Sequence, residues 1–300
     1  MKVSVLMPTY NHEKFIAQAI DSFLMQKCNF ETELLIGDDC STDNTLKIAK
    51  DYAEKFPEKV KIFEKKHNEG LLKNYKTLIS NAKGEYFAIL ESDDYWTDEQ
   101  KLQKQVDFLD KNPEYGISFT QHSRLRDGKL ELQGKERLKR LEKYKDCLYE
   151  SFILQHNKIQ SPTVVFRKDL YVKYCNIDDY INLNFQTFDF PTWVSIIRHS
   201  KIHYLAEPTT AYRVIPTSIS NSNDWAKRIA FTENIMQIKR YIFSLYGKGQ
   251  LSDFHIQWRD NFIIGRQARK HKKFGIALKF LIFEQLNAVW KYLILRKKLV

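Results

Sequence analysis

The chain has 300 residues, of which 43% are hydrophobic and 14% aromatic, and this composition excludes a disordered or low-complexity protein. A formal charge of +11 at pH 7 indicates anionic partners, such as phosphates, nucleic acid or an acidic membrane surface. Free thiols are expected, because no two of the four cysteines have the spacing of a metal site: Cys28, Cys40, Cys147 and Cys175. The N-terminal MKVSVLMPTYN predicts a strand rather than a signal peptide, so we expect a cytoplasmic protein.

Strands and helices alternate over the first 90 residues. Apolar, β-branched runs predict strands at 2–8, 33–39, 60–65 and 84–90, and apolar residues at helical spacing predict helices at 12–26, 41–56 and 71–82. Ser41 or Thr42 could cap the second helix. The alternation predicts an α/β fold with a doubly wound, mostly parallel sheet flanked by helices.

Polar residues follow each of the four predicted strands. In an open α/β sheet, ligands bind outside the carboxyl ends of the strands, so we expect these four loops to form one site. The residues are Pro8, Thr9, Tyr10 and Asn11 after the first strand, Asp38 and Asp39 after the second, His67, Asn68, Glu69 and Gly70 after the third, and Glu91, Asp93 and Asp94 after the fourth.

The cluster after the fourth strand, ILESDDYW at 89–96, holds three carboxylates within four residues. Such a group suits Mg²⁺ or Mn²⁺, which binds one or two carboxylates together with phosphate oxygens and water. A cation held there can stabilise a diphosphate leaving group. Alternatively, Asp93 and Asp94 cap the following helix and Glu91 is a solvated strand end. The chain contains neither GxxxxGK[ST] nor GxGxxG, which argues against a P-loop enzyme or a dinucleotide dehydrogenase.

Together these stretches resemble the family 2 glycosyltransferases of the GT-A fold, which transfer a sugar from a nucleotide diphosphate donor with inversion. The resemblance runs through 3–26, 33–49, 68–96 and, more loosely, 188–220. It implies a GT-A domain over 1–220, with a nucleotide-sugar-binding half at 1–115 and an acceptor-binding half at 116–220. Residues 221–300 would form a helical, basic C-terminal extension.

The resemblance implies a role for several individual residues of the first half. Pro8, Thr9 and Tyr10 would line the nucleotide pocket, while Asp38 would meet the base, usually uracil, with Asp39 beside it. Asn68 and Gly70 would approach the nucleotide, and Asn74 matches a commonly polar helix position. Glu91, Ser92, Asp93 and Asp94 match the family's DxDD metal motif with Glu in place of the first Asp. Asp93 and Asp94 are the favoured ribose and metal contacts, and Glu91 is a further metal candidate.

Each of these assignments has a structural alternative. Pro8, Thr9 and Asn11 could only turn the chain and cap the first helix. Asp38 or Asp39 could cap the second helix. The HNEG segment holding Asn68 and Gly70 could be a simple turn, and Asn74 could be a surface residue.

In the second half, the resemblance places Asp189 of QTFDFPTW at the position of the family's catalytic carboxylate, which takes the proton of the acceptor hydroxyl. The alternative is a helix cap, with Pro191 in the first turn. Many relatives have Glu where this chain has Phe188. Arg213 could pair with phosphate or form a surface ion pair, and Ile215 replaces a His found in many relatives.

Several other conspicuous residues are expected to have structural rather than catalytic roles. Trp96 and Trp193 are expected to pack in the core rather than to stack on a sugar. His156 is expected at the surface, near a strand where relatives shape the acceptor pocket. The basic segment 135–145 is expected to be a solvated flap.

The C-terminal segment carries most of the net charge. Residues 265–300 contain ten Lys and Arg against one Glu, and Lys279, Glu284 and Lys291 interrupt the apolar run at 274–295. This pattern suits a basic amphipathic helix on an anionic leaflet better than a transmembrane span. Packing on the enzyme core or on a second subunit is the alternative.

Two functions follow from these observations. The first is an inverting, metal-dependent glycosyltransferase that uses a nucleotide sugar, expected to be a UDP-sugar, with Mn²⁺ or Mg²⁺. It would act at the inner face of the plasma membrane on a glycan or lipid-linked acceptor in surface polysaccharide synthesis. The second is a non-catalytic nucleotide- or nucleic-acid-binding protein. The carboxylates at the strand ends oppose nucleic acid as a partner, because they repel its phosphates.

Overall fold

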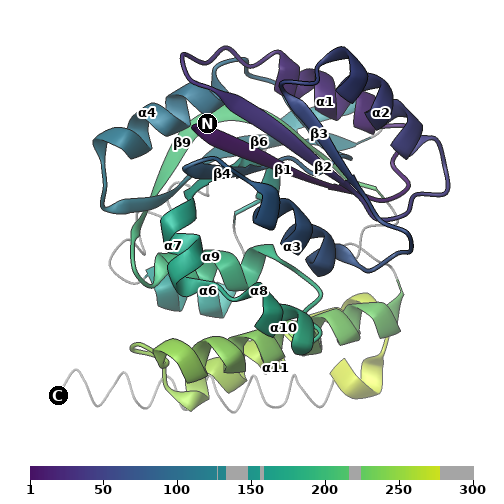
Figure 1. Cartoon of the computed structure of the whole chain (residues 1–300). Helices are drawn as coiled ribbons and strands as arrows, with labels where there is room; N and C mark the ends of the chain where they lie inside the picture. The colour runs from purple at the N-terminus through teal and green to yellow at the C-terminus, as the bar shows by residue number, and fades with distance from the viewer. Residues whose placement is uncertain (127, 133–147, 156–158, 216–223, 278–300) are drawn as a thin grey trace. The chain divides into compact units, whose positions relative to one another are not determined.

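The computed structural model describes residues 1–126, 128–132, 148–155, 159–215 and 224–277 (Figure 1). The chain divides into two compact units. Unit 1 comprises Met1–Leu148 and Asn157–Val214, and unit 2 comprises Tyr149–His156 and Ile215–Val300. The four loops singled out in the sequence all belong to unit 1.

One curled sheet forms the centre of unit 1. Its strands lie in the order β3-β2-β1-β4-β8-β6-β9-β5, and β7 pairs with β6. Pairing shows that β1–β4, β6 and β9 run in one direction and that β5, β7 and β8 run in the other. The strands are β1 Val3–Thr9, β2 Thr32–Asp38, β3 Val60–Glu64, β4 Tyr86–Ile89, β5 Tyr95–Trp96, β6 Tyr115–Arg126, β7 Lys129–Leu132, β8 Val164–Arg167 and β9 Lys201–Arg213.

Helices cover both faces of this sheet, as the sequence predicted. The apolar sides of α1 Ile16–Leu24, α2 Thr45–Lys55 and α4 Lys101–Lys111 pack on one face over β1, β2 and β4. On the other face lie α3 Leu71–Asn81, α7 Lys168–Tyr174, α8 Ile177–Asn182 and α9 Asp189–Ile197 (Figure 1). Every residue of β1 is buried, which explains why this central parallel strand is apolar without alternation. The mixed α/β architecture with a mostly parallel sheet is therefore confirmed.

Aromatic side chains join the second helical layer to the sheet. Phe166 of β8 lies edge-on to Phe87 of β4 at 5.6 Å and to Trp193 of α9 at 5.1 Å between ring centroids. Tyr75 of α3 stacks on Phe188, directly before α9, at 4.1 Å. Edge-on and stacked rings at these distances add to the stability gained from burial. Through these contacts α9, which is distant in sequence, is fixed against α3.

The starts of two helices differ from the sequence expectations. Helix α2 begins at Thr45 with Asn44 as its N-cap residue, so the prediction of a Ser41 or Thr42 cap is wrong. The Asp43 carboxylate instead accepts the Thr45 N–H at 3.0 Å. The two residues after Asp94 form the short strand β5 rather than the start of a helix. This excludes the helix-cap interpretation of Asp93 and Asp94.

Unit 2 is helical where it is described. It contains α10 Trp225–Tyr246, α11 Asp253–Lys270 and most of α6 Leu148–Gln155. Lys239 of α10 is 1% exposed and pairs with Asp260 of α11 at 2.5 Å, while Tyr149 of α6 donates its hydroxyl to the Gly247 carbonyl at 2.6 Å. A helix long and apolar enough to cross a membrane is absent from the residues that the structure describes.

Candidate active site

The acidic loop, defined as Glu91 to Asp94, turns tightly at the carboxyl end of β4. The Asp94 N–H donates to the Glu91 carbonyl at 2.9 Å, which closes the turn. Ser92 donates its hydroxyl to Thr9 Oγ1 at 2.8 Å and lies 3.3 Å from the Pro8 carbonyl. These contacts fasten the acidic loop to the end of β1, so the first and fourth of the predicted loops share one edge of the sheet.

Burial and mutual repulsion raise the pKa values of two carboxyl groups in this loop. Burial is the main reason that the pKa of Asp94 lies well above its usual value, and the charges of Asp93 and Glu91 raise it further. The pKa of Glu91 is raised to about 8 by burial and then by the charges of Asp93 and Asp189, although a hydrogen bond from Ser161 opposes the shift. The loop therefore needs protons or a cation to balance its charge at neutral pH.

Asp189 lies beside the acidic loop although 95 residues separate it from Asp94. It is the first residue of α9, and its carboxylate accepts the Thr187 hydroxyl and the N–H of Phe190, the latter at 2.6 Å. Its charge contributes to the raised pKa values of Glu91 and of the buried Tyr75. Phe188, in place of the Glu of many relatives, is 1% exposed and stacks on Tyr75. An apolar contact thus fixes the start of α9.

Arg213, at the end of β9, lies across the acidic loop. Its backbone N–H donates to Asp94 Oδ1 at 2.6 Å, and its Nε donates to the Asp93 carbonyl at 2.8 Å. The guanidinium lies 4.5 Å from the centroid of the Phe15 ring, and Nη2 donates to Gln18 at 2.8 Å. Arg213 forms no ion pair within 4.0 Å among the described residues, so its alternative as a surface ion pair is not supported.

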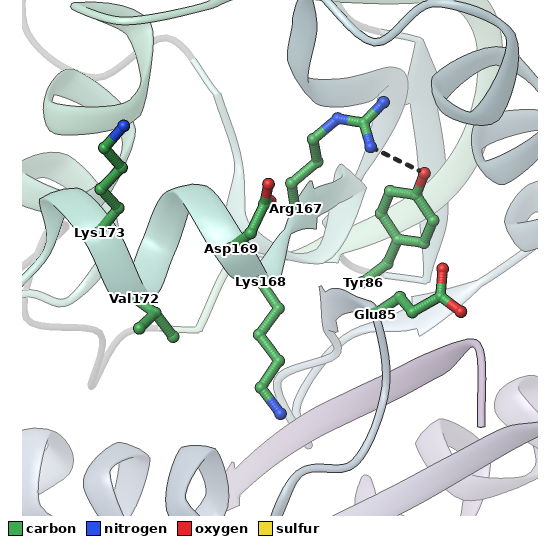
Figure 2. A pocket seen from close by; sticks show the side chains of 7 residues that line it. All are labelled: Glu85, Tyr86, Arg167, Lys168, Asp169, Val172 and Lys173. Atoms are coloured by element: carbon green, nitrogen blue, oxygen red, sulfur yellow. Dashed lines mark hydrogen bonds between the residues drawn. The ribbon is translucent and has the colours of Figure 1, made fainter.

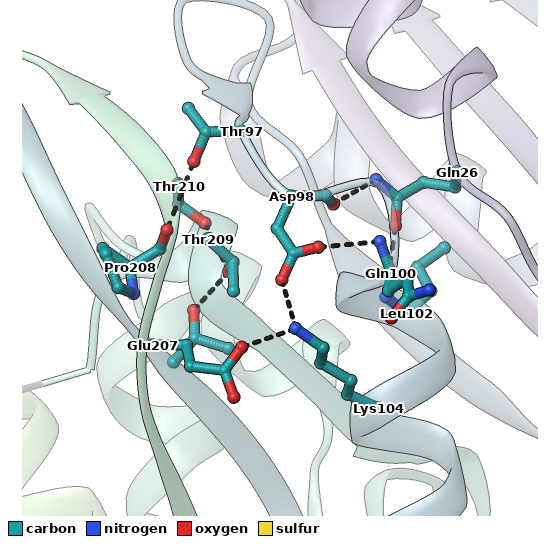
Figure 3. A network of polar contacts seen from close by, with 11 residues as sticks. Gln26, Thr97, Asp98, Gln100, Leu102, Lys104, Glu207, Pro208, Thr209 and Thr210 are labelled. Carbon is teal, nitrogen blue, oxygen red and sulfur yellow. Dashed lines mark hydrogen bonds and ion pairs between the residues drawn. The ribbon is translucent and has the colours of Figure 1, made fainter.

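A polar network holds β9 in place beside β5 (Figure 3). Lys104 pairs with Asp98 at 2.8 Å and with Glu207 at 2.5 Å, and the Thr97 N–H donates to the Thr209 carbonyl at 2.8 Å. Tyr95 and Trp96 of β5 then pair with Ala211 and Thr210 of β9. Two residues further along β9, Arg213 reaches the acidic loop.

The two aspartates at the carboxyl end of β2, Asp38 and Asp39, have different partners. The Asp39 carboxylate accepts the N–H groups of Glu69 and Gly70, each at 2.8 Å, and so connects the second loop to the third. Asp38 Oδ2 accepts the Ser41 N–H at 3.0 Å, whereas the buried Oδ1 has no hydrogen-bond partner. Neither aspartate caps α2, so that alternative is wrong. The unpaired Oδ1 is the acceptor that a base N–H would need.

The remaining residues predicted for the nucleotide pocket lie around this edge. Thr9 is 3% exposed, Tyr10 is 43% exposed and Asn68 is exposed. Gly70 precedes α3 with φ of 89°, a conformation that favours glycine. Asn74 is 2% exposed and donates to the Gly37 carbonyl at 2.6 Å, so its interpretation as a surface residue is wrong.

Asn11 does not cap α1, whose N-cap position is Phe15 without a side-chain hydrogen bond. Its Oδ1 instead accepts the Thr42 N–H at 2.8 Å, which joins the first loop to the second. All four loops are therefore connected by hydrogen bonds. The clustering that the strand ends predicted is present at the level of side chains.

The described residues do not include three or more His, Cys, Asp or Glu side chains arranged to hold a metal ion by themselves. A hard divalent cation does not require such a cage, because phosphate oxygens and water complete its coordination. The chemistry of Asp93 and Asp94 fits this requirement, since both offer carboxylate oxygens, and burial together with the charges of Asp93 and Glu91 raises the pKa of Asp94 despite the opposing charge of Arg213. Glu91 adds a third carboxylate to the same turn.

Sequence reasoning missed several residues that complete the site. Ser161 belongs to the short 3₁₀ helix η2 Ser161–Thr163 and hydrogen-bonds Glu91. Gln18 supports Arg213, and the His12 Nδ1 atom lies 2.7 Å from Ser92 Oγ. His12 directly follows the polar run PTYN at the end of the first strand, and this position could have indicated that it lies near the site. Ser161 had none, because its approach to Glu91 depends on the path of the chain through β6 and β8.

A cavity of about 560 Å³ lies near the start of β4 and the end of β8, at the opposite edge of the sheet (Figure 2). Two of the three cations that line it have structural roles. Arg167 donates to the Leu109 carbonyl at 2.5 Å and Lys168 to the Ala82 carbonyl at 2.8 Å, so each satisfies the end of a helix. This cavity is therefore separate from the acidic loop and is not the candidate active site.

Trp96 and Trp193 are 1% and 0% exposed, as expected for packing residues. The Trp96 indole N–H donates to the Pro162 carbonyl at 2.8 Å, which holds η2 near the acidic loop. His156 and the predicted flap at 135–145 lie outside the described residues, as does the C-terminal segment from 278 onward.

The sheet, its two helical layers and the acidic loop at the strand ends define a glycosyltransferase of the GT-A fold. Solved structures of this fold superpose on the chain. Staphylococcus aureus TarS in complex with UDP-GlcNAc matches with a TM-score of 0.54 and 20% identity, over 90% of this chain and 81% of that chain. The mannosyltransferase PcManGT from Pyrobaculum calidifontis, in complex with GDP-Man and Mn²⁺, matches with a TM-score of 0.55 and 17% identity, over 96% and 84%.

The chain belongs to glycosyl transferase family 2, whose family model matches residues 4–171. TuaG of Bacillus subtilis, named as a glycosyltransferase of teichuronic acid biosynthesis, is 30% identical over 233 residues, which cover 74% of this chain and 82% of TuaG. The match to mycobacterial relatives is 42% identical over 117 residues and spans about a third of their length. The family predicted from the sequence is therefore confirmed.

Proposed function

We propose that the protein is an inverting, metal-dependent glycosyltransferase that transfers a sugar from a UDP-sugar to a hydroxyl group of a glycan or lipid-linked acceptor. The observation that carries this proposal is the gathering of Glu91, Asp93, Asp94 and Asp189 at one strand edge, where burial and repulsion raise two carboxyl pKa values. Such a cluster is stabilised when a divalent cation and its diphosphate bind beside it.

In this proposal the donor lies along the edge formed by the four loops. Asp38 Oδ1, which is buried without a partner, accepts a hydrogen bond from the base, and the loop residues Pro8, Thr9, Tyr10, Asn68 and Gly70 surround the nucleotide. Asp39 keeps its two backbone partners and supports the pocket from behind. Arg213 binds the diphosphate through the guanidinium N–H groups that its contacts with Asp93 and Gln18 leave free.

Asp93 and Asp94 would hold the cation, Mn²⁺ or Mg²⁺, with Glu91 as a further candidate ligand. When bound, the cation would neutralise charge on the diphosphate as it leaves. Asp189 accepts the proton of the acceptor hydroxyl while that oxygen attacks the anomeric carbon and the bond to the diphosphate breaks. A single attack from the face opposite the leaving group inverts the anomeric configuration.

The relatives suggest where the product belongs. TuaG is named for teichuronic acid biosynthesis and TarS for poly(ribitol-phosphate) β-N-acetylglucosaminyl transfer, so we propose a role in the synthesis of surface polysaccharide. The described part of the C-terminal segment has exposed apolar residues beside its cations, with Phe274 70% exposed and Ile276 40% exposed. We propose that this segment binds the anionic inner face of the plasma membrane.

The deciding experiment is a panel of nucleotide sugars offered to the purified protein with Mn²⁺, Mg²⁺ or a chelator, with release of the nucleotide diphosphate as the measurement. We expect turnover of a UDP-sugar that stops when the chelator is added and returns with excess Mn²⁺. Turnover that continues unchanged in chelator would remove the metal from the proposal. Preference for a GDP-sugar would show that the base is guanine rather than uracil, and the proposal of sugar transfer from a nucleotide diphosphate would stand.

A further inference from the structure

His12 contacts the loops that follow three different strands. It lies in the loop after β1, and its backbone N–H donates to Thr45 Oγ1 at the start of α2 at 2.7 Å. Its ring Nδ1 is 2.7 Å from Ser92 Oγ in the acidic loop. Its carbonyl accepts the N–H groups of Phe15 and Ile16, which begin α1. One residue thus connects the loops after β1, β2 and β4.

The hydrogen bonds of Ser92 favour one of the two neutral tautomers of the His12 ring. Ser92 Oγ has three neighbours within hydrogen-bond distance: His12 Nδ1 at 2.7 Å, Thr9 Oγ1 at 2.8 Å and the Pro8 carbonyl at 3.3 Å. The carbonyl can only accept, and the single Ser92 proton is directed toward Thr9 and Pro8. The Ser92 oxygen is then an acceptor toward His12. An Nδ1–H tautomer of the His12 ring fits this arrangement.

Ser92 lies between Glu91 and Asp93 and is fully buried. Without His12, the Ser92 hydroxyl would keep its contacts with β1 but would lose its shortest hydrogen bond, so Ser92 would be held less firmly. Because Asp93 directly follows Ser92, a small rotation of this turn changes the direction of its carboxylate. Misplacement by about 1 Å in a site of this kind is enough to reduce turnover strongly.

We propose that His12 is a positioning residue: its Nδ1–H holds Ser92 and thereby fixes the direction of the acidic-loop carboxylates toward the metal and diphosphate. This inference rests on the proposed function, because it concerns how that site is oriented. It predicts a specific tautomer, which can be measured without any ligand. It also predicts that a side chain with a donor at the Nδ1 position can replace His12.

The first test is nuclear magnetic resonance of ¹⁵N-histidine-labelled protein in the absence of metal and nucleotide. We expect the Nδ1–H tautomer at His12, with its signals identified by their absence in His12→Asn. Ser92→Ala should shift the Nδ1 resonance, because the acceptor is removed. The proposal would be overturned by a His12 ring protonated on Nε2 alone, or by a His12 resonance that Ser92→Ala does not shift. This holds whichever nucleotide sugar or metal the enzyme uses.

The second test compares three substitutions with a matched control. Asn places its amide N–H₂ near the position of Nδ1, Gln places it near Nε2, and Phe keeps only the ring. His12→Phe and His12→Gln should lower turnover about tenfold and raise the Mn²⁺ concentration for half-maximal activity, as the loss of one short hydrogen bond implies. His12→Asn should stay within about threefold of the wild type. The control is His203→Phe, which removes a His–Ser contact of 3.1 Å to Ser118, away from the site, and should leave both constants unchanged.

The outcomes separate this inference from the proposed function. A wild-type protein that consumes no nucleotide sugar contradicts the proposed function, and the tautomer measurement then still decides the role of His12. If the wild type turns over a nucleotide sugar and His12→Phe has the same turnover as the control His203→Phe, the result contradicts the inference about His12 but not the proposed function. A larger loss in His12→Asn than in His12→Phe would assign His12 to packing of its ring on Phe15, whose centroid lies 6.1 Å away, and would overturn the inference as well. If His12→Phe does not fold, Ser92→Ala gives the same comparison, and the double variant Ser92→Ala with His12→Asn should lose no more than Ser92→Ala alone.

Discussion

The backbone N–H of Arg213 donates to the Asp94 carboxylate at 2.6 Å, so the last residue of β9 completes the turn that follows β4. This contact joins positions 119 residues apart and satisfies one oxygen of a carboxylate that is 2% exposed. Burial raises the pKa of Asp94, the charges of Asp93 and Glu91 raise it further, and Arg213 opposes these effects. The acidic loop and the end of β9 therefore form one site.

Asp94→Asn should abolish transfer while preserving the fold. The amide oxygen can still accept the Arg213 N–H, but the charge that would hold the cation and diphosphate is lost. One electrostatic group of this kind is typically worth ~3 to 4 kcal/mol in a transition state, or ~10² to 10³ in rate. The measurement is nucleotide release in saturating Mn²⁺, with Asp107→Asn on the exposed face of α4 as the control. Turnover near the wild-type rate would contradict the metal role of Asp94.

Asp189→Asn should bind the donor and metal normally and fail in transfer. The amide oxygen can keep the contacts with Thr187 and the Phe190 N–H, so α9 should start at the same residue. It cannot accept the proton of the acceptor hydroxyl. Binding of UDP with Mn²⁺ by calorimetry and the rate of sugar transfer measure the two properties separately. An unchanged transfer rate would show that Asp189 only supports the start of α9.

Arg213→Lys should raise the KM for the donor more than it lowers kcat. A lysine keeps the charge and the backbone N–H to Asp94, but it cannot contact the Asp93 carbonyl, Gln18 and a phosphate together. Hydrogen bonds to charged groups are worth ~1.5 to 3 kcal/mol, so we expect a rise of ~10- to 100-fold in KM. Gln18→Ala, which removes only the supporting contact, should give a smaller change in the same direction. Equal KM values for Arg213→Lys and the wild type would exclude a phosphate contact.

Lys101 makes the stability of the protein depend on pH. Its ammonium group is 0% exposed, lies 4.5 Å from the Trp96 ring centroid and donates to Gln105 at 2.7 Å, and burial lowers its pKa to about 7. Between this value and the ordinary value of 10.5 the unfolded chain binds more protons than the folded one. The free energy of unfolding should therefore rise with pH across this range, by up to ~1.4 kcal/mol per unit from this group.

Lys101→Met should remove this dependence and stabilise the protein at pH 7, where the buried amine is partly charged. Chemical denaturation at pH 7, 8 and 9 gives the slope for each protein. The gain in stability should shrink as the pH rises toward 10, because the wild-type amine is then neutral when folded. Parallel stability curves for the two proteins would show that Lys101 is solvated or paired with a charge.

The C-terminal cations should control membrane binding. Replacing Arg269, Lys270, Lys272 and Lys273 by Gln should release the protein from anionic vesicles, since each cation near such a surface contributes ~1 kcal/mol. Replacing the exposed Lys55, Lys59, Lys83 and Lys111 of unit 1 by Gln changes the net charge equally and should not release it. Co-sedimentation with vesicles at low and high salt is the measurement, and donor hydrolysis should survive in both variants. Equal binding by both variants would place the contact elsewhere.

Much of the donor half was predictable from the sequence. Apolar runs predict parallel strands that are buried on both faces, and amphipathic repeats predict the helices that cover them. The carboxyl ends of parallel strands lie at the same edge of the sheet. The runs at 2–8, 33–39, 60–65 and 84–90 therefore located the loops that carry Thr9, Asp38, Gly70 and Asp93. The family was indicated by the resemblance that the same residues carry, and the family model and the similarity to TuaG confirm it.

The tertiary structure decided which of these residues meet and what each is free to do. Asp38 and Asp39 are adjacent and chemically identical, yet Asp39 is saturated by two N–H groups of the third loop while Asp38 keeps an unpaired oxygen. Asp189 approaches Glu91 through the stacking of Phe188 on Tyr75, and Arg213 reaches Asp94 through the pairing of β5 with β9. Local sequence encodes strand ends and helix faces, whereas these contacts depend on packing between segments about a hundred residues apart, which no local pattern contains.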